Sequence, residues 1–183
     1  DEVIEAIDPS KFYIAVDTNA WLLNKEKALH LKNIGVDKCQ ISLDSFIEEE
    51  HDLFRKRKGS YKRVLEGVHN AKSAGMKVIV MTCLTKTRTY SQEFLNMLEW
   101  TKKNDIGLYV TFAKPVGAWE NNTEELCGYK EIEHIQNLSN NYAYGEYFTL
   151  VKQWQEDRVI DKNSVIISNL ESSRIDINNF SGL

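Results

Sequence analysis

Polar residues directly follow the apolar runs of the sequence, and their side chains are suited to chemistry. Asp17, Thr18 and Asn19 come after the run 12–16, and Ser42 lies near the end of a later short run. A carboxylate can bind a metal ion, whereas hydroxyl and amide groups hydrogen-bond polar ligands. These positions raise a choice between a metal site around Asp17 and a site for a polar ligand.

Basic side chains occupy two later segments of the same kind. Lys86 and Arg88 lie just after an apolar run, where the carboxylate or phosphate of a substrate could bind; the alternative is a solvated basic loop. Lys114, Pro115 and Gly117 follow the next such run, and the alternative there is an ordinary strand-to-helix connection. Both segments are therefore candidate ligand contacts.

Apolar, β-branched runs alternate with segments of helical periodicity, and these elements must position the polar residues. The expected strands are 12–16, 38–44, 76–84 and 107–113. Helices are expected over 24–35, 45–59, 59–75 and around Phe94, Leu95 and Leu98. Asn24 is the expected N-cap of the first helix and Ser60 that of the third. Such alternation predicts βαβ units, hence a parallel sheet with helices outside it. Ligands then bind beyond the carboxyl ends of the strands, where the polar residues lie.

The second half of the chain has a weaker pattern. After Pro115, the segments 121–139 and 144–157 have helical spacing, and 164–169 has the character of a late strand. A chain of 183 residues without a Ser-, Gly- or Pro-rich linker predicts a single domain over 1–183. Its C-terminal part is expected to be mainly helical.

Composition argues against several function classes. The formal charge is −4 and Lys and Arg are spread along the chain, so no nucleic-acid partner is expected. Cys39, Cys83 and Cys127 form no C-x-x-C pair, which argues against a disulfide framework or a zinc site and favours a reducing, cytoplasmic setting. No apolar stretch approaches the roughly 18 residues that span a bilayer, so no membrane partner is expected.

The residues that follow the first strand resemble, over a short stretch, the opening of the PIN-domain nucleases. Two-metal hydrolysis needs several carboxylates that converge on the ions. Asp44 is the only other acid at an expected strand end, and the acidic run 48–50 suits the exposed face of a helix. A metal-dependent nuclease that uses Asp17 is therefore kept as a third alternative.

Taken in order, the strand-end motifs resemble those of the radical S-adenosylmethionine superfamily. The match covers about residues 10 to 120 and consists of TNA at 18–20, QISLDS at 40–45, the segment 51–75, VIVMTCLTK at 78–86 and AKPVGAW at 113–119. The segment 51–75 contributes the spacing of His51-Asp52, Arg55 and Gly59-Ser60. Ala20 departs from the glycine that the family often has there, which bears on the backbone shape of that turn.

The resemblance implies an α/β fold, a partial (β/α) barrel with parallel strands and outer helices that cradles S-adenosylmethionine for 5′-deoxyadenosyl radical chemistry. It also implies a four-iron four-sulfur cluster held by three cysteines on one loop. This sequence has no such loop, so we expect the cluster only from a missing N-terminal part, and the chain to start in the helix before the family's third strand. The alternative is a cluster-less binding or scaffold module of the same fold.

The resemblance also implies roles for the strand-end residues. Ser42 is expected to hydrogen-bond the amino-acid or ribose end of the cofactor, with capping of the following helix as the equal alternative. Thr18 and Asn19 would contact substrate or cofactor. Asp44 is also a candidate cofactor contact, with ordering of its loop by accepting backbone N–H bonds as the favoured role.

The later segments would surround the same ligand. The turn at Lys114, Pro115 and Gly117 would meet the adenine through its backbone groups. Lys86 and Arg88 would face the substrate, a small molecule or a peptide of unknown identity.

Other residues have a structural interpretation. His51 and Asp52 suit capping and pairing at a helix start, and the four tryptophans suit packing. Without preceding strands, the run 12–16 would be an edge strand with unpaired backbone groups, which predicts self-association of the chain through it.

Side chains alternate along a strand, so Asp17 and Thr18 point to opposite sides. We expect Thr18 to face the ligand cavity together with Ser42 of the adjacent strand. We expect Asp17 to turn toward the helix layer and to pair with a Lys, an Arg or backbone N–H groups. Converging carboxylates of Asp17 and Asp44 would instead favour the nuclease.

Overall fold

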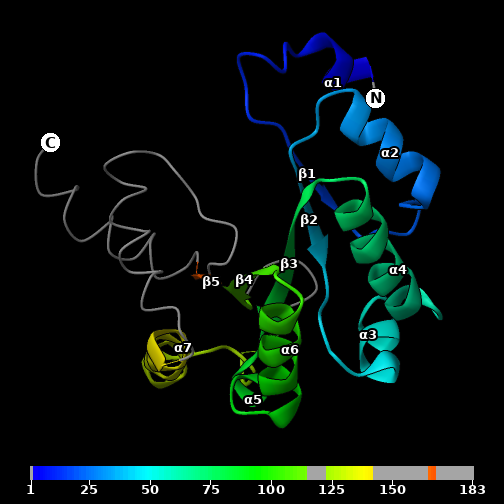
Figure 1. Ribbon diagram of the computed structural model, residues 1–183. Coiled ribbons are helices and arrows are strands. Elements are labelled where there is room, and N and C mark those ends of the chain that lie inside the picture. The colour runs from blue at the N-terminus through cyan, green and yellow to red at the C-terminus, as the bar shows by residue number, and fades with distance from the viewer. Residues whose placement is uncertain (1, 115–122, 142–164, 168–183) are drawn as a thin grey trace, which may run out of the picture.

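The computed structural model describes residues 2–114, 123–141 and 165–167. Its five parallel strands form one sheet in the order β1-β2-β3-β4-β5 (Figure 1). The strands are β1 Ala15–Thr18, β2 Lys38–Ser42, β3 Lys77–Leu84, β4 Gly107–Phe112 and β5 Val165–Ile167. The helices are α1 Glu2–Ala6, α2 Lys25–Asn33, α3 Glu48–Phe54, α4 Ser60–Ser73, α5 Lys86–Thr89, α6 Gln92–Lys103 and α7 Tyr129–Asn141.

Strand order follows chain order, so each connection returns the chain to the next position in the sheet. Right-handed crossovers of this kind place the helices on one face, and a sheet wound in one direction curves toward a barrel. In Figure 1, helices α2, α4 and α3 run along one side of the sheet. The α/β fold class, a partial (β/α) barrel with parallel strands and outer helices, is confirmed.

The two faces of the sheet differ in polarity. The helix-facing side carries fully buried apolar residues, among them Cys39, Ile41, Val80, Leu108 and Val110. They form one core with helix residues that include Val64, Val68, Phe94 and Met97. The opposite side, which a closed (β/α) barrel turns to its interior, carries the half-buried Gln40, Ser42, Met81, Tyr109 and Thr111.

Capping residues fix where the helices begin. Asn24 accepts the Lys27 N–H at 2.8 Å and caps α2, as predicted. The cap of α4 is Gly59, with φ of 82°, rather than Ser60. The carboxylate of Asp52 accepts the backbone N–H groups of Gly59 and Tyr61, which confirms the predicted capping by Asp52.

The first strand is shorter than predicted. β1 begins at Ala15, and Phe12 and Tyr13 are 61% and 57% exposed, so the run 12–16 is not a strand buried on both faces. β1 lies at the edge of the sheet, next to β2. Self-association through this edge stays a prediction.

The C-terminal elements are described in part. α7 lies within the predicted helical segment 121–139 except for its last residues, and β5 lies within the predicted strand 164–169. The predicted helix over 144–157 falls outside the described residues. A single domain over 1–183 stays a prediction.

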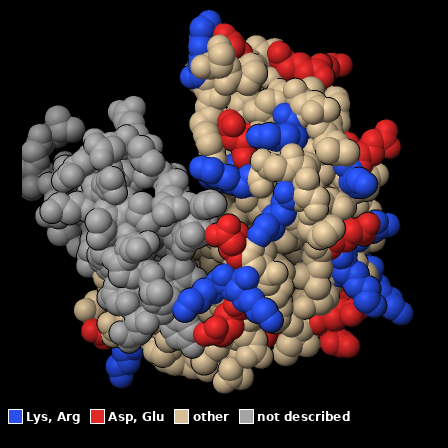
Figure 2. Space-filling model, viewed as in Figure 1, with Lys and Arg blue, Asp and Glu red and all other residues tan. Residues whose placement is uncertain are grey.

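Charges of both signs are mixed on the visible face of the described residues (Figure 2). On the face shown in Figure 2, Lys and Arg side chains alternate with Asp and Glu side chains and form no continuous basic area. The expected absence of a nucleic-acid partner stays a prediction, as does the cytoplasmic setting. No helix within the described ranges has both the length and the apolar character needed to cross a membrane.

Candidate functional site

Ser42 ends β2 with its side chain on the polar face of the sheet. Its side chain is half-buried, and its hydroxyl has no hydrogen-bond partner among the described residues. Ser42 does not cap the following helix, because the N-cap of α3 is Ile47 and no side chain makes a capping hydrogen bond there. The Ser42 hydroxyl is therefore available to a ligand.

Asp17 and Thr18 lie on the faces opposite to those predicted. Thr18 is in register with Ile41 and shares its helix-facing side, and the Thr18 hydroxyl accepts the Ala20 N–H at 3.0 Å. Asp17 is exposed and in register with Gln40, whose side-chain amide donates to the Asp17 carboxylate. The predictions that Thr18 faces the ligand side with Ser42 and that Asp17 faces the helix layer were wrong.

The alternation of side chains along β1 explains this outcome. Val16 packs against the core, and Thr18, two residues later, must share its face.

The chain turns directly after β1. Asn19 is exposed, and its Oδ1 accepts the Trp21 N–H at 3.0 Å. Ala20 has φ of 59°, so an alanine keeps the left-handed backbone that favours glycine.

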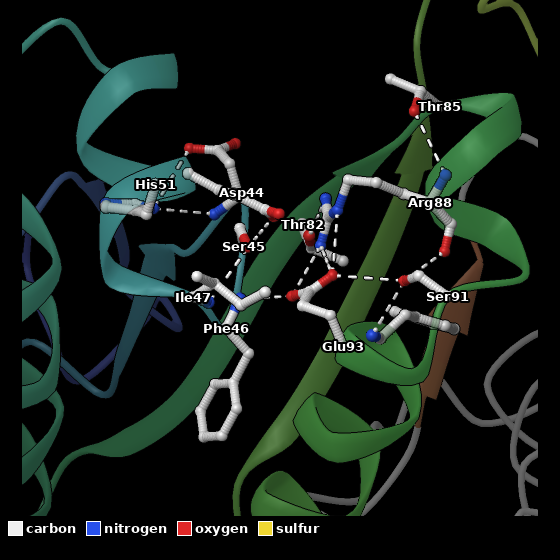
Figure 3. Close-up of polar contacts among 12 residues, drawn as sticks. Asp44, Ser45, Phe46, Ile47, His51, Thr82, Thr85, Arg88, Ser91 and Glu93 are labelled. Carbon is white, nitrogen blue, oxygen red and sulfur yellow. Dashed lines mark hydrogen bonds and ion pairs between the residues drawn. The ribbon is translucent and has the colours of Figure 1, made fainter.

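Asp44 is 6% exposed and orders the β2–α3 loop, but through a side-chain bond rather than by accepting backbone N–H groups as expected. Its carboxylate accepts a hydrogen bond from Arg55 Nε. Its own N–H donates to His51 Nδ1 at 3.1 Å (Figure 3). The Asp44 carboxylate is thus engaged within the protein, and its predicted contact with the cofactor stays a prediction.

His51 is held as a neutral ring. It is 1% exposed, and burial lowers its pKa against the opposing attraction of Asp44. Because Nδ1 accepts the Asp44 N–H, the ring proton lies on Nε2. Nδ1 of His51 and Oδ2 of Asp44 lie 3.8 Å apart, but with a neutral ring they do not form an ion pair.

Two more elements hold the same loop. Ser45 Oγ donates to Glu50 Oε2 at 2.7 Å. The Phe46 N–H donates to Glu93, which reaches across from α6 (Figure 3). Residues 43–47 are therefore tied to both α3 and α6. Glu93 was not predicted, because nothing in the sequence distinguishes it from Glu99, the exposed acid of the same helix.

Arg88 has its donors committed within the protein. Its Nη2 lies 3.1 Å from Glu93 Oε2 in a largely buried ion pair. Its Nη1 donates to Thr82 Oγ1 at 3.2 Å and to the Cys83 carbonyl at 2.9 Å. These contacts give Arg88 a structural role and do not support its expected contact with a substrate. That contact stays a prediction.

The remaining predicted residues follow β3 and β4 at the same edge of the sheet. Lys86 is exposed on α5, where its N–H donates to the Glu125 carbonyl at 2.9 Å. Lys114 is exposed after β4, and Pro115 and Gly117 lie outside the described residues. Their contacts with substrate or cofactor stay predictions.

The described residues do not fit a metal centre. Within the described ranges, no group of three or more His, Cys, Asp and Glu side chains could hold a metal ion. Burial raises the pKa of Cys39 to about 11, and it also raises the pKa values of Cys83 and Cys127, which disfavours thiolate ligands. Nothing here supports the nuclease alternative, and the described part offers no place for an iron–sulfur cluster.

Comparison with known proteins decides the family. The sequence model of the Radical SAM superfamily matches residues 1–101, more than half of the chain. The chain belongs to the radical SAM superfamily. This radical SAM chain is 29% identical to GTP 3′,8-cyclase 2 of Pseudomonas aeruginosa over 124 residues, which are 67% of the chain and 37% of the cyclase. It is 40% identical to Fe-coproporphyrin III synthase of Methanosarcina barkeri over 63 residues, 34% of the chain and 16% of the synthase.

A solved structure shares the fold of the radical SAM chain. The crystal structure of Streptococcus suis SuiB matches it with a TM-score of 0.61 and 12% sequence identity, covering 91% of this chain and 35% of SuiB. At this identity the likeness concerns the fold alone, and it agrees with the partial barrel. The radical SAM chain spans well under half the length of each of these three proteins.

Proposed function

We propose that this radical SAM chain is the part of an enzyme core that cradles S-adenosylmethionine at the carboxyl edge of its sheet. The observation that carries the proposal is the half-buried Ser42 hydroxyl, which ends β2 on the polar face without a partner among the described residues. Membership of the superfamily supports the choice of ligand. Thr18 is left out of the proposal, because its hydroxyl faces the helix layer and bonds Ala20.

The residues of the chain would orient the ligand. A hydroxyl such as that of Ser42 can donate to a carboxylate or ribose oxygen and accept from an amino group. The loop that follows does not have to reorganise on binding, because Asp44, Ser45 and Phe46 are already held by α3 and α6. When bound beside a reduced iron–sulfur cluster, S-adenosylmethionine supplies a 5′-deoxyadenosyl radical.

The cluster is proposed to come from a part of the protein outside these 183 residues. The described residues do not fit one, and Cys39, Cys83 and Cys127 are the only cysteines of the sequence. The substrate class stays at a small molecule or a peptide. The names of the relatives, a GTP 3′,8-cyclase and an Fe-coproporphyrin III synthase, point to different substrates.

Binding of radiolabelled S-adenosylmethionine to the protein expressed from its complete reading frame tests the proposal. Ser42→Ala is expected to weaken binding about fivefold, which corresponds to one hydrogen bond of about 1 kcal/mol. Ser73→Ala, at the exposed end of α4, is the matched control and should bind like the wild type. Equal affinities of the wild type and Ser42→Ala would contradict the role of this hydroxyl.

Iron and sulfide analysis separates the two versions of the fold. After anaerobic reconstitution, stoichiometric incorporation of a four-iron four-sulfur cluster is expected for the complete protein. A protein that takes up no iron would instead be the cluster-less binding or scaffold module.

A further inference from the structure

A cavity of about 220 Å³ lies where the β1–α2 turn meets α3 and the start of α4. It is lined by Asn19, Trp21, His51, Arg55, Arg57 and Ser60. Ser42 is not among these residues, so the cavity is separate from the hydroxyl proposed to bind S-adenosylmethionine. Its lining is rich in side chains that carry N–H donors.

His51 contributes a buried donor without a partner. Its side chain is 1% exposed, and Nδ1 is occupied by the Asp44 N–H at 3.1 Å. The proton therefore lies on Nε2, for which the described part of the chain provides no acceptor. A buried N–H without an acceptor is destabilising, and native proteins satisfy nearly all such groups. Because His51 lines the cavity, this donor without an acceptor is consistent with a ligand bound there.

Two guanidinium groups add positive charge. Arg57 is exposed, its Cζ lies 3.4 Å from the centroid of the Trp21 ring, and no carboxylate among the described residues pairs with it. Arg55 is bonded to Asp44 through Nε, which leaves its two terminal nitrogens for another acceptor. An arginine fixed by stacking or pairing presents donors suited to carboxylate and phosphate oxygens.

The carboxylates near the cavity are already engaged. Asp44 accepts from Arg55. Asp52 accepts from the N–H groups of Gly59 and Tyr61 and from the Ser60 hydroxyl at 2.9 Å. Neither of these two carboxylates accepts from His51 Nε2 or pairs with Arg57.

We propose that this cavity binds an oxyanion, the carboxylate or phosphate group of a small molecule, with His51 Nε2 and the guanidinium groups of Arg55 and Arg57 as donors. The site does not depend on S-adenosylmethionine and would persist if the proposed function failed. Trp21 forms one wall and holds Arg57 in place by a cation–π contact.

Nuclear magnetic resonance of the protein, expressed from its complete reading frame with ¹⁵N-labelled histidine, tests the proposal. Inorganic phosphate and acetate are titrated separately at constant ionic strength, and the Nε2 signal of His51 is identified by its loss in His51→Asn. A saturable shift of that signal with either anion is expected, and which anion saturates tells the two sources apart. No saturable shift with either anion would overturn the proposal.

Matched variants separate a site from a general charge effect. Arg57→Gln is expected to weaken binding about fivefold or more. Lys58→Gln removes an equal charge at the position directly after Arg57. Lys58 does not line the cavity, so this variant should bind the anion with unchanged affinity. Equal losses in the two variants would show only nonspecific attraction and would also overturn the proposal. Both positions are exposed, so neither change should unfold the protein.

Discussion

Two loops at the carboxyl edge of the sheet are fixed in different ways. The β2–α3 loop, residues 43–47, is held by the buried side chains of His51 in α3 and Glu93 in α6 and by Arg55 just after α3, and its Asp44 is 6% exposed. The β1–α2 turn, residues 19–24, is held by short-range bonds such as that between Asn19 Oδ1 and the Trp21 N–H. It also contacts α4, where Ala20 packs against Gly67 and the Leu23 carbonyl accepts from Asn70 Nδ2 at 3.0 Å.

The first loop is therefore part of the structural framework, whereas the second presents a surface that can bind ligands. Polar residues of the first loop depend on buried or partly buried side-chain partners, so changes there should lower stability. The exposed side chains of the second loop make few contacts with the rest of the protein, so substitutions of them should affect ligand binding more than stability. The exceptions are Ala20 and Leu23, which are buried against α4.

The largest effect is expected from Glu93→Ala. Removing this carboxylate leaves Arg88 as a largely buried charge without its partner and leaves the Phe46 N–H without its acceptor. The free energy of unfolding should fall by about 3–5 kcal/mol, as measured by urea denaturation. Glu99→Ala, at an exposed position of the same helix, should change it by no more than about 0.5 kcal/mol. Similar values for both variants would show that α6 does not hold the β2–α3 loop.

The next effect concerns the close contact of the other loop. A Cβ added at Gly67 would lie 2.6 Å from the Cβ of Ala20, so Gly67→Ala should lower the free energy of unfolding by about 1–3 kcal/mol. Ala20→Gly in the same chain removes the clashing atom and suits the φ of 59°. The double variant should therefore be more stable than Gly67→Ala alone. Strict additivity of the two changes in a double-mutant cycle would contradict this packing.

A smaller effect is expected in the pH dependence of stability. Burial lowers the pKa of His51 in the folded protein below the 6.5 of the unfolded chain. Above pH 6.5 His51 is neutral in both the folded and the unfolded state, and its stabilising contribution is complete. As the pH falls toward the folded pKa, the unfolded chain binds more protons than the folded protein, and the contribution is lost. The protein should therefore lose stability between about pH 7 and pH 5.

His51→Asn isolates this contribution. The Asn side-chain oxygen can replace Nδ1 as the acceptor of the Asp44 N–H, but it does not titrate. The free energy of unfolding of this variant should fall less steeply between the same pH values. His30, His69 and His134 are common to both proteins, so parallel curves would mean that burial of His51 is not responsible.

The sequence predicted those features that depend on neighbours in the chain. Strand and helix alternation and the Asn24 cap are local patterns, and the structure has both. The face of Thr18 was also open to derivation, because Val16 had to join the core and its face repeats two residues later. The bond between Phe46 and Glu93 joins residues 47 positions apart. No sequence pattern indicates which acid of α6 turns inward to make it.

The smallest effect is expected at Asp17, the candidate metal ligand of the nuclease alternative. Its carboxylate is exposed and accepts from the Gln40 amide, so Asp17→Asn should change the free energy of unfolding by no more than about 0.5 kcal/mol. Asp44→Asn makes the same chemical change at the end of the next strand but takes the anion away from Arg55 in a buried site, so it should be clearly more destabilising. Urea denaturation of both variants measures the contrast. Equal losses would mean that the β2–α3 loop is no better fixed than the β1–α2 turn. Manganese-dependent cleavage of single-stranded RNA that disappears in Asp17→Asn would bring back the metal site, because only a catalytic carboxylate can matter for activity while contributing so little to stability.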